Sequence, residues 1–215
     1  LAAIVSAQAA TEFSTDGRIL PANDNFLGAL GYTLAEIKGQ HHSMFATPDY
    51  RSSAEYRAFW DKLGRGEFDA GQYKRIAKGG REIWIQATYN PIFDPDGKAY
   101  KVVKYASDVT EQVKAAQMLQ LAVEQSQHAM TAAEQGDLTR RVPMDGKSGQ
   151  IEALCGGINR MLETTSSVFD DVGRVFGALA QGDLSQRIDR DYQGSFGEVR
   201  RNANVTSQTL SDVID

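Results

Sequence analysis

The sequence predicts two unlike parts, an α+β domain followed by an all-α region, and the distribution of residue types supports this division. Both tryptophans, six of the nine phenylalanines and seven of the eight tyrosines precede Gln150. After Asp108 the chain becomes rich in alanine, glutamine, serine, glutamate and valine. The first mixture favours strands and tight turns, whereas the second favours long helices. We therefore expect a domain boundary near residues 108–114.

Turn residues divide the first half into short strands and helices. A Ser-Thr-Asp-Gly segment at residues 14–17 separates two short runs and is typical of a hairpin. Residues 23–30 are expected to form a helix ended by Gly31, and residues 53–63 a second helix with its apolar residues on one stripe. The predicted strands cover residues 11–13, 19–20, 68–76, 82–93 and 99–107. This order predicts a five-stranded antiparallel sheet with helices packed on one face.

The overall composition excludes several classes of protein. The 215 residues include 23 basic and 28 acidic side chains, a net charge of −5, whereas a general nucleic-acid-binding protein would show a basic surplus. No uncharged apolar run approaches the roughly 18–20 residues needed to cross a bilayer, so no membrane insertion is expected. A single cysteine, Cys155, excludes an intramolecular disulfide framework and fits a reducing, cytoplasmic location. Because the chain begins with Leu1 and ends inside a helical pattern, we expect a piece of a longer protein.

The second half contains an internal repeat. Residues 133–142 (AEQGDLTRRV) recur as residues 179–188 (LAQGDLSQRI), 46 residues later, and such self-similarity marks an array of structural units. Between the two copies, apolar residues follow a heptad spacing that is typical of a coiled coil. The predicted seam consists of Ile151, Leu154, Ile158, Met161, Val168, Val172, Val175 and Leu179. A thinner seam before the first copy consists of Ala122, Ser126, Ala129 and Ala133.

The seams predict that the chain pairs with a second copy of itself. A single amphipathic helix cannot bury its apolar stripe alone, so each seam needs a partner. Each repeat offers two helices joined by a connector long enough to run back along a helix, so the two helices can lie parallel. Two copies of the chain would then complete a four-helix bundle in each repeat. The sequence therefore predicts a homodimer with two stacked parallel four-helix bundles.

The first half resembles a PAS domain, a sensor module with a pocket between its sheet and its helices. The motifs that carry the resemblance lie at residues 16–23, 31–39, 73–85 and 108–110. The resemblance places the domain at residues 1–112. A sub-family resemblance to the PAS sensors of bacterial chemoreceptors, including flavin-binding aerotaxis transducers, is carried by residues 39–44, 48–49 and 59–64. The implied ligand-binding candidates are Asn23, Phe26, His42, Met44, Asp49 and Trp60.

The second half resembles two tandem HAMP domains, which relay signals through helical bundles. The Gly-Asp-Leu-Thr/Ser motif stands at residues 136–139 and 182–185, and an Arg-aliphatic pair follows each copy. The resemblance places the two domains at residues 113–165 and 166–215. Residues 159–162 resemble the end of the family's second helix, whereas Asn204-Val205-Thr206 departs from it. Together the two resemblances imply signal-relay roles for Asp108, Thr110, Gly136, Asp137, Leu138, Gly182, Asp183 and Leu184.

The PAS resemblance leaves four occupants of the pocket open: flavin (FAD), haem, a small metabolite or nothing. Aerotaxis transducers carry an Arg-His pair before the Pro-Asp of their flavin cleft, and here Ala46 and Thr47 stand in its place. Haem needs an axial donor, usually histidine. The helix at residues 53–63 contains no histidine, which leaves His41 and His42 in this half. No arrangement of histidine, cysteine or carboxylates predicts a catalytic or metal site.

The sequence thus predicts a signal-transducing receptor rather than an enzyme. A PAS input would act through two HAMP domains on an output module beyond Asp215. By resemblance, that output is control of a chemotaxis kinase together with its coupling protein, and a histidine kinase or cyclase output is the alternative. Two other classes stay open, a flavin- or haem-dependent enzyme and a dimerisation scaffold with an empty PAS domain.

Overall fold

The computed structural model describes residues 8–214, so the first seven residues of the predicted first domain lie outside the described residues. The chain divides into two compact units, the first ending at Ala115 and the second beginning at Ala116. The strands of the described chain all belong to the first unit, and the second unit consists of helices and the connectors between them.

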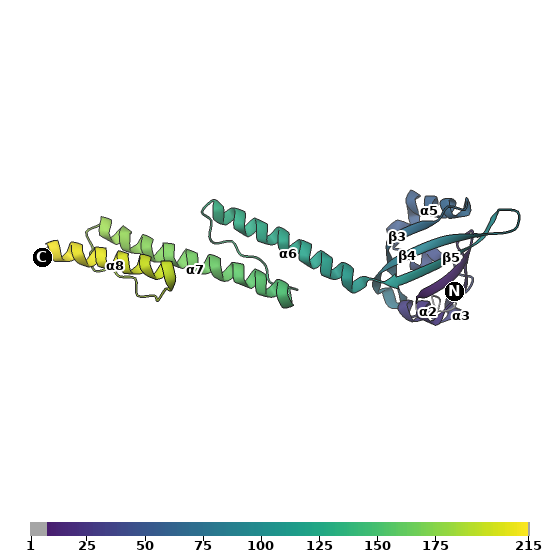
Figure 1. Cartoon of the computed structure of the whole chain (residues 1–215), viewed down its shortest axis with the longest axis horizontal. Helices are drawn as coiled ribbons and strands as arrows, with labels where there is room; N and C mark the ends of the chain where they lie inside the picture. The colour runs from purple at the N-terminus through teal and green to yellow at the C-terminus, as the bar shows by residue number, and fades with distance from the viewer. Residues whose placement is uncertain (1–7, 215) are drawn as a thin grey trace. The chain divides into compact units, whose positions relative to one another are not determined.

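The first unit is built on a five-stranded antiparallel sheet, as predicted, with the strand order β2-β1-β5-β4-β3 (Figure 1). The strands are β1 (Ala9–Ser14), β2 (Ile19–Ala22), β3 (Asp69–Ile76), β4 (Glu82–Phe93) and β5 (Ala99–Asp108). Gly17, with φ at 86°, closes the β1–β2 hairpin in the left-handed region that favours glycine. The turn residues therefore end the strands close to where the sequence predicts.

Short helices pack against one face of this sheet. They are α2 (Asp24–Leu30), α3 (Leu34–Ile37), η1 (His42–Phe45), α4 (Pro48–Ser52) and α5 (Ala54–Gly64), with the one-turn η2 (Lys78–Gly80) between β3 and β4. Asn23 caps α2 by accepting from the Phe26 amide, and Gly31, with φ at 74°, ends that helix. Ser53 caps α5 by accepting from the Tyr56 amide. Both predicted helices are confirmed to within one residue at each end.

The core of the first unit lies between α5 and the sheet. The predicted stripe on α5, Tyr56, Phe59, Trp60 and Leu63, is buried along its whole length. The Phe59 ring lies edge-on to Tyr89 of β4, with ring centroids 4.9 Å apart. Burying a large apolar side chain of this kind contributes about 1.5–3 kcal/mol. The stripe therefore fixes α5 on the sheet.

The second unit contains three long helices, α6 (Thr110–Glu134, which starts in the first unit), α7 (Gly149–Ala180) and α8 (Gly194–Ile214). We call residues 135–148 the first connector and residues 181–193 the second connector. Each connector runs back along the helix before it, so that consecutive helices point the same way (Figure 1). Helix α7 continues without a break through residues 165 and 166, where the sequence analysis places a domain boundary.

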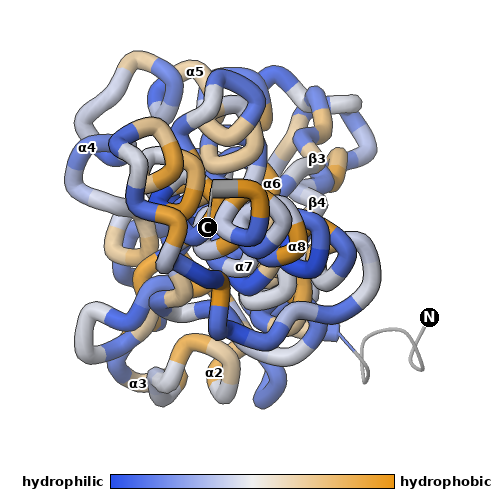
Figure 2. The backbone as a smooth tube through the Cα atoms, turned by 90° about the vertical axis from the view of Figure 1, so that its left-hand side faces the viewer, coloured by the Kyte–Doolittle hydropathy of each residue, from blue (hydrophilic) through white to orange (hydrophobic). Residues whose placement is uncertain are grey.

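Two small apolar clusters hold these helices and connectors together. The first joins Ala122 and Ala129 of α6 with Val142 of the first connector and Cys155 and Leu162 of α7. The second consists of Val168, Val175, Ile188, Tyr192 and Ala203. In Figure 2, hydrophobic and hydrophilic residues alternate around the turns of α7 and α8, as expected of amphipathic helices. Among the described residues, no helix is both long enough and apolar enough to span a membrane.

Phe59→Ala is expected to lower the free energy of unfolding of the first unit by about 3–5 kcal/mol, because it opens a cavity among packed rings. Phe68 is 66% exposed, so Phe68→Ala removes the same kind of side chain from a solvent-exposed position. It is expected to lower the free energy of unfolding by less than about 0.5 kcal/mol. Denaturant unfolding of the two variants, followed by tryptophan fluorescence, measures the difference. Equal losses would contradict the packing of α5 described above.

Candidate functional site

A buried histidine lies at the centre of the first unit. His42 is fully buried, and each of its ring nitrogens meets a tyrosine hydroxyl. Nδ1 lies 3.0 Å from Tyr56 Oη, and Nε2 lies 3.1 Å from Tyr89 Oη. Burial lowers the pKa of His42 well below its usual value, and the charges of Arg75 and Lys104 lower it further. The neutral ring therefore donates to one hydroxyl and accepts from the other.

Arg75 of β3 brings a guanidinium group into the same core. It is 2% exposed, and its Cζ lies 4.8 Å from the ring centroid of Tyr73 and 5.7 Å from that of Tyr50. Nη1 donates to the carbonyl of Lys74 at 2.8 Å, and Nη2 donates to Tyr89 Oη at 3.3 Å. Nε is buried and has no hydrogen-bond partner among the described residues. One N–H donor of the guanidinium is therefore left without an acceptor.

Lys104 of β5 is a second buried cation, 1% exposed. Its Nζ lies 5.2 Å from the ring centroids of Phe26 and Tyr89. Burial lowers the pKa of Lys104, Tyr89 opposes this shift, and Arg75 adds to it. Burial alone would raise the pKa of Tyr89, but the charges of Lys104 and Arg75 outweigh burial and lower it. Two nitrogens, His42 Nε2 and Arg75 Nη2, thus lie within hydrogen-bond distance of Tyr89 Oη, and the amino group of Lys104 lies near the Tyr89 ring. We call His42, Arg75, Tyr89 and Lys104 the Tyr89 cluster.

The Tyr89 cluster contains no carboxylate. None of the buried side chains in the described part of the chain is acidic. Asp69 of β3 lies nearby, but its Oδ2 accepts from Tyr73 Oη at 2.6 Å and its Oδ1 pairs with Lys62 at 2.6 Å. Both oxygens of that carboxylate are therefore engaged. Burying an ion without a counter-ion costs several kcal/mol, so the cluster is held together by the rest of the fold.

Four of the six predicted pocket residues lie in this interior. His42 belongs to the Tyr89 cluster, and Phe26 lies against Lys104. Trp60 is buried with its ring centroid 5.4 Å from that of His42, and Met44 packs against the same core. The structure therefore brings these four together beneath the sheet.

The other two predicted pocket residues lie elsewhere. Asn23 caps α2 and ties it to β1, because its Oδ1 accepts from the amides of Phe26 at 3.0 Å and Ala10 at 2.9 Å. Asp49 lies exposed in the first turn of α4. Neither side chain joins the Tyr89 cluster.

The interior, packed as it is, fits neither flavin nor haem. Besides the Phe59–Tyr89 contact, Phe13 and Trp60 have ring centroids 5.6 Å apart, so aromatic rings fill the space beneath the sheet. The cavity that borders Lys104 has a volume of about 20 Å³, room for about one water molecule. His42, the histidine within this core, has both ring nitrogens engaged by tyrosines and is not free to ligate iron.

The two buried cations were not among the predicted site residues, although the sequence holds a signal for one of them. Lys104 lies in phase with the buried Val102 and Ala106 on β5, so strand alternation places its side chain on the inner face. Arg75 follows Tyr73 on the inner face of β3 in the same way. Neither charge is expected inside from its residue type, because lysine and arginine are almost never fully buried unless paired.

The end of the sheet is hydrogen bonded to the start of α6 through the two predicted relay residues. Thr110 Oγ1 accepts from the amide of Trp84 on β4 at 2.9 Å, and the Val109 amide donates to the Trp84 carbonyl at 2.9 Å. Asp108 Oδ1 accepts from the Thr110 amide at 2.8 Å. The first turn of α6 is therefore attached directly to a central strand.

Both connectors leave their helices through the same glycine turn. Gly136 and Gly182 have φ values of 89° and 82°, where any other residue would be strained. The amides of Asp137 and Asp183 donate to the carbonyl five residues back, at 2.9 and 3.0 Å, as in a Schellman cap. Each aspartate then accepts from the amide two residues on, at 3.0 Å in the first connector and 2.9 Å in the second. The predicted motif residues thus build two matching helix ends.

An asparagine binds each connector to the helix that follows it. Asn159 accepts from the Val142 amide and donates to the Val142 carbonyl, both at 2.8 Å. Asn204 makes the same pair of bonds with Ile188, at 2.8 and 3.1 Å. We call these contacts the asparagine clamps. The departure from the family pattern at residues 204–206 leaves this contact intact.

The predicted seam of α7 divides into covered and uncovered positions. Val168 and Val175 are buried, and Ile151, Ile158, Val172 and Leu179 pack against the two apolar clusters. Leu154 and Met161 are instead 61% and 56% exposed. Phe169 and Phe176 of the same helix are also exposed, at 66% and 49%. We call Leu154, Met161, Phe169 and Phe176 the exposed row of α7.

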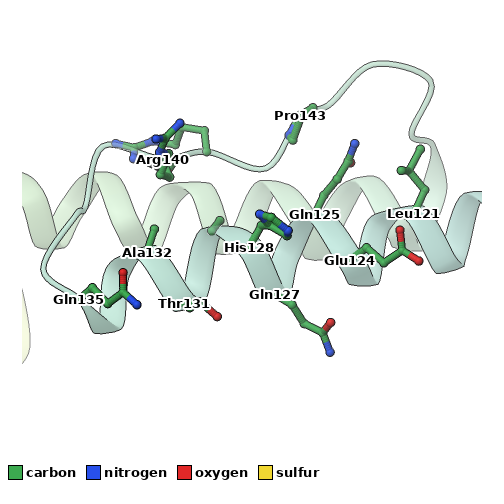
Figure 3. Close-up of a pocket in the computed structure, with 12 residues that line it drawn as sticks. Leu121, Glu124, Gln125, Gln127, His128, Thr131, Ala132, Gln135, Arg140 and Pro143 are labelled. Atoms are coloured by element: carbon green, nitrogen blue, oxygen red, sulfur yellow. Dashed lines mark hydrogen bonds between the residues drawn. The ribbon is translucent and has the colours of Figure 1, made fainter.

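A groove of about 940 Å³ lies between α6 and the first connector (Figure 3). Gln125 and His128 point from α6 toward the connector, whereas Gln127 and Thr131 point away from it. Arg140 and Pro143 line the opposite side. The charged side chains of this groove are all exposed, unlike those of the Tyr89 cluster. In the described part of the chain, no three histidine, cysteine or acidic side chains lie close enough to hold a metal ion.

Two family models match the chain. Residues 19–106 match the model described as the PAS fold, and residues 146–212 match the model described as a HAMP domain. The chain contains a PAS domain and a HAMP domain. The HAMP match spans α7, the second connector and most of α8, whereas α6 and most of the first connector precede it.

Three characterised proteins are similar to parts of the chain. The biofilm dispersion protein BdlA of Pseudomonas aeruginosa is 45% identical over 114 residues, which cover 53% of this chain and 27% of that protein. The methyl-accepting chemotaxis protein McpB of the same organism is 35% identical over 136 residues, 63% of this chain and 19% of that protein. The aerotaxis receptor of Escherichia coli is 38% identical over 74 residues, 34% of this chain and 14% of that protein. The chain therefore spans about a quarter or less of the length of these relatives.

The HAMP domain holds an acidic contact that the first connector lacks. Asp171 Oδ2 accepts from Tyr192 Oη at 2.7 Å, and Oδ1 pairs with Arg174 at 3.3 Å. The Tyr192 hydrogen bond, helped by Arg174 and Arg190, lowers the pKa of Asp171 although burial opposes the shift. Gln125 stands 46 residues earlier and accepts from Lys147 at 2.6 Å. Protonation can therefore weaken the contact in the HAMP domain but not its counterpart.

Asn204→Ala is expected to destabilise the HAMP domain by about 1–3 kcal/mol, because it leaves the amide and carbonyl of Ile188 without partners. Asn159→Ala should have a similar effect on the first connector. Asn202→Ala, at an exposed position on the same helix as Asn204, is the control and should change stability by less than about 0.5 kcal/mol. Thermal unfolding followed by circular dichroism measures all three. An Asn204→Ala variant as stable as the control would contradict the clamp.

Acid is expected to weaken the HAMP domain through Asp171. Since the folded-state pKa lies below the unfolded value of about 3.9, the stabilisation is present above that value and is lost as pH falls through the folded-state pKa. Asp171→Asn should cost about 1 kcal/mol at pH 7 and flatten the loss of stability between about pH 5 and pH 3. Asp170→Asn, at the exposed neighbour, should leave the slope as in the wild type. Urea unfolding across this range checks both variants, and identical slopes in all three proteins would disprove the role of Asp171.

Proposed function

We propose that this chain is the sensor and relay portion of a homodimeric, cytoplasmic chemoreceptor whose output controls a chemotaxis kinase together with its coupling protein. The observation that carries the proposal is the exposed row of α7, which needs a partner helix along both repeats. The receptor class is supported by the relatives described as a methyl-accepting chemotaxis protein and an aerotaxis receptor. The kinase-controlling output would lie outside the 215 residues.

The proposal includes a second HAMP unit formed by α6, the first connector and the first half of α7. The support is the match in detail between the two connectors. Both begin with a left-handed glycine, both carry a capping aspartate, and both end in an asparagine clamp. Two connectors with the same hydrogen bonds in the same order support the same fold for both repeats.

A second copy of the chain is the partner that we propose for the exposed row. The same pattern continues on the neighbouring helices, where Leu119, Val123 and Met130 of α6 are 52%, 46% and 41% exposed. On α8, Phe196, Val199 and Leu210 are exposed as well. A monomer rarely leaves such long apolar rows in water. Two copies in parallel would cover them and complete a four-helix bundle in each repeat.

The relay would begin at the hydrogen bonds between Trp84 and Thr110. A change in the PAS interior that shifts β4 or β5 would alter the position of Asp108 and Thr110, and so the first turn of α6. The first repeat has a core of small residues, with Ala122, Ala129 and Cys155, where the second has Val168 and Val175. Less apolar area holds the first bundle together, which suits an element with two arrangements a few kcal/mol apart.

A ligand-free dimerisation scaffold is the second candidate function, because aromatic side chains fill the PAS interior. The two candidates differ in a measurable way. A sensor binds a small molecule in the PAS domain and changes the start of α6, whereas a scaffold does neither.

The double variant Phe169→Asp and Phe176→Asp is expected to convert the dimer to a monomer, because each copy of the chain would then bring two charges into a buried helix contact. The control is Thr164→Asp, which adds a charge at an exposed polar position of the same helix. Light scattering of the full chain gives the mass of each variant. A monomeric wild type, or a dimer that persists in the double variant, would rule out the proposed pairing.

A further inference from the structure

The PAS interior holds two buried basic side chains and, among the described residues, no buried carboxylate. Arg75 and Lys104 are 2% and 1% exposed. Arg75 Nη2 donates to the Tyr89 hydroxyl, and Lys104 Nζ lies 5.2 Å from the Tyr89 ring centroid. No described acidic side chain is buried, and the neighbouring Asp69 is engaged by Tyr73 and Lys62. Two like charges at close range without a counter-charge are strongly unfavourable in a low-dielectric core. An anion bound between them would remove this cost.

The unpartnered Nε of Arg75 indicates which anion fits. Nη1 is taken by the Lys74 carbonyl, and Nη2 makes a long 3.3 Å bond to Tyr89, while Nε has no partner. The Nε–Nη2 edge presents two parallel donors, the geometry that a planar carboxylate accepts in a bidentate pair. Surrounding rings such as Phe26 and Tyr73 provide an apolar wall for a short carbon skeleton.

Lys104 marks the side from which a ligand can enter. It borders the cavity of about 20 Å³ between α2 and the sheet, together with Phe26 and Leu30 of α2. Ser107 and Asp108, at the end of β5, also line this cavity. The cavity holds about one water molecule, so an organic acid needs α2 to shift outward. Such a shift would act next to Asp108, the residue that caps the first turn of α6.

We propose that the PAS domain binds a small organic carboxylate, with the carboxylate paired to the open edge of Arg75 and to Lys104. The inference rests on the proposed sensor function and names its ligand class. Inorganic phosphate fits less well, because two cations and a tight aromatic wall do not replace the hydration of a dianion with many acceptor oxygens. Entry of the ligand would displace α2 and carry the change to the junction at Asp108.

Thermal unfolding of the full chain with sodium acetate, lactate, succinate or benzoate tests the proposal, against sodium chloride at equal ionic strength. At a hundredfold excess over Kd, at least one carboxylate should raise Tm by roughly 5 °C or more. Lactamide, which lacks the charge, should have no effect. Absence of a shift with all four acids, or an equal shift with phosphate or chloride, would overturn the carboxylate assignment.

Variants locate the site. Lys104→Met should unfold at a higher temperature than wild type without ligand, because an unpaired buried charge is removed, and it should lose the carboxylate response. Lys101→Met, on the outer face of the same strand, should keep the response. Arg75→Lys keeps the positive charge but removes the paired donors of the guanidinium. It should weaken carboxylate binding, measured by calorimetry, at least tenfold. A response that survives in Lys104→Met would place the ligand elsewhere and refute the proposal.

A separate readout distinguishes this inference from the proposed relay. Hydrogen exchange at residues 108–113 should slow or quicken when the carboxylate binds. Calorimetric binding without any change in exchange would leave the anion site standing and count against the relay. A dimer that binds no carboxylate would refute the anion site and leave the proposed dimer standing.

Discussion

The helical unit depends on one constraint, that a chain running back along its own helix must satisfy its backbone groups without a neighbouring strand. The asparagine clamps meet this constraint, because a side-chain amide carries N–H donors and a carbonyl acceptor side by side, like a peptide group. Asn159 and Asn204 use both on a single residue of each connector. With that residue fixed, Val142 and Ile188 are held facing inward, and the helices on either side can lie parallel. The two apolar clusters follow from this arrangement.

The PAS domain has a different constraint, because its core is well packed in shape but unfavourable in charge. Its rings pack closely enough to look like an ordinary core, yet the centre of that core carries Arg75 and Lys104 around a tyrosine hydroxyl. Cation–ring contacts and hydrogen bonds soften the cost of these charges without cancelling it. Lys104 of this core lies on β5, the strand that leads into α6.

The sequence predicted those features of the fold that local chemistry decides. Glycine and capping residues such as Gly31 and Ser53 end and begin helices through their own backbone and hydroxyl groups, so α2, α5 and the strands of the PAS domain could be predicted closely. The bounds of the shorter α3, η1 and α4 were not predicted. The heptad pattern identified apolar positions on α7, but it could not tell which ones the chain covers itself, because Val168 and Leu154 share the pattern and differ in their neighbours. The buried cations were not predicted, since burial of a charge is decided by tertiary packing and not by residue type. At residues 204–206 the sequence departs from the family pattern, yet Asn204, which makes the hydrogen bonds to Ile188, is present.

Helix α7 is one uninterrupted rod of 32 residues, about 48 Å long, and it belongs to both repeats. The exposed row is spaced by seven residues in each half but by eight across the middle, from Met161 to Phe169. On an ideal helix that extra residue turns the row by about 100° more than a regular step would. A second, parallel copy of α7 that covers the exposed row in the first half of the helix would therefore face a different side of the helix in the second half. In a parallel pair of chains, the contact surfaces of the two repeats would therefore have different rotational phases on α7.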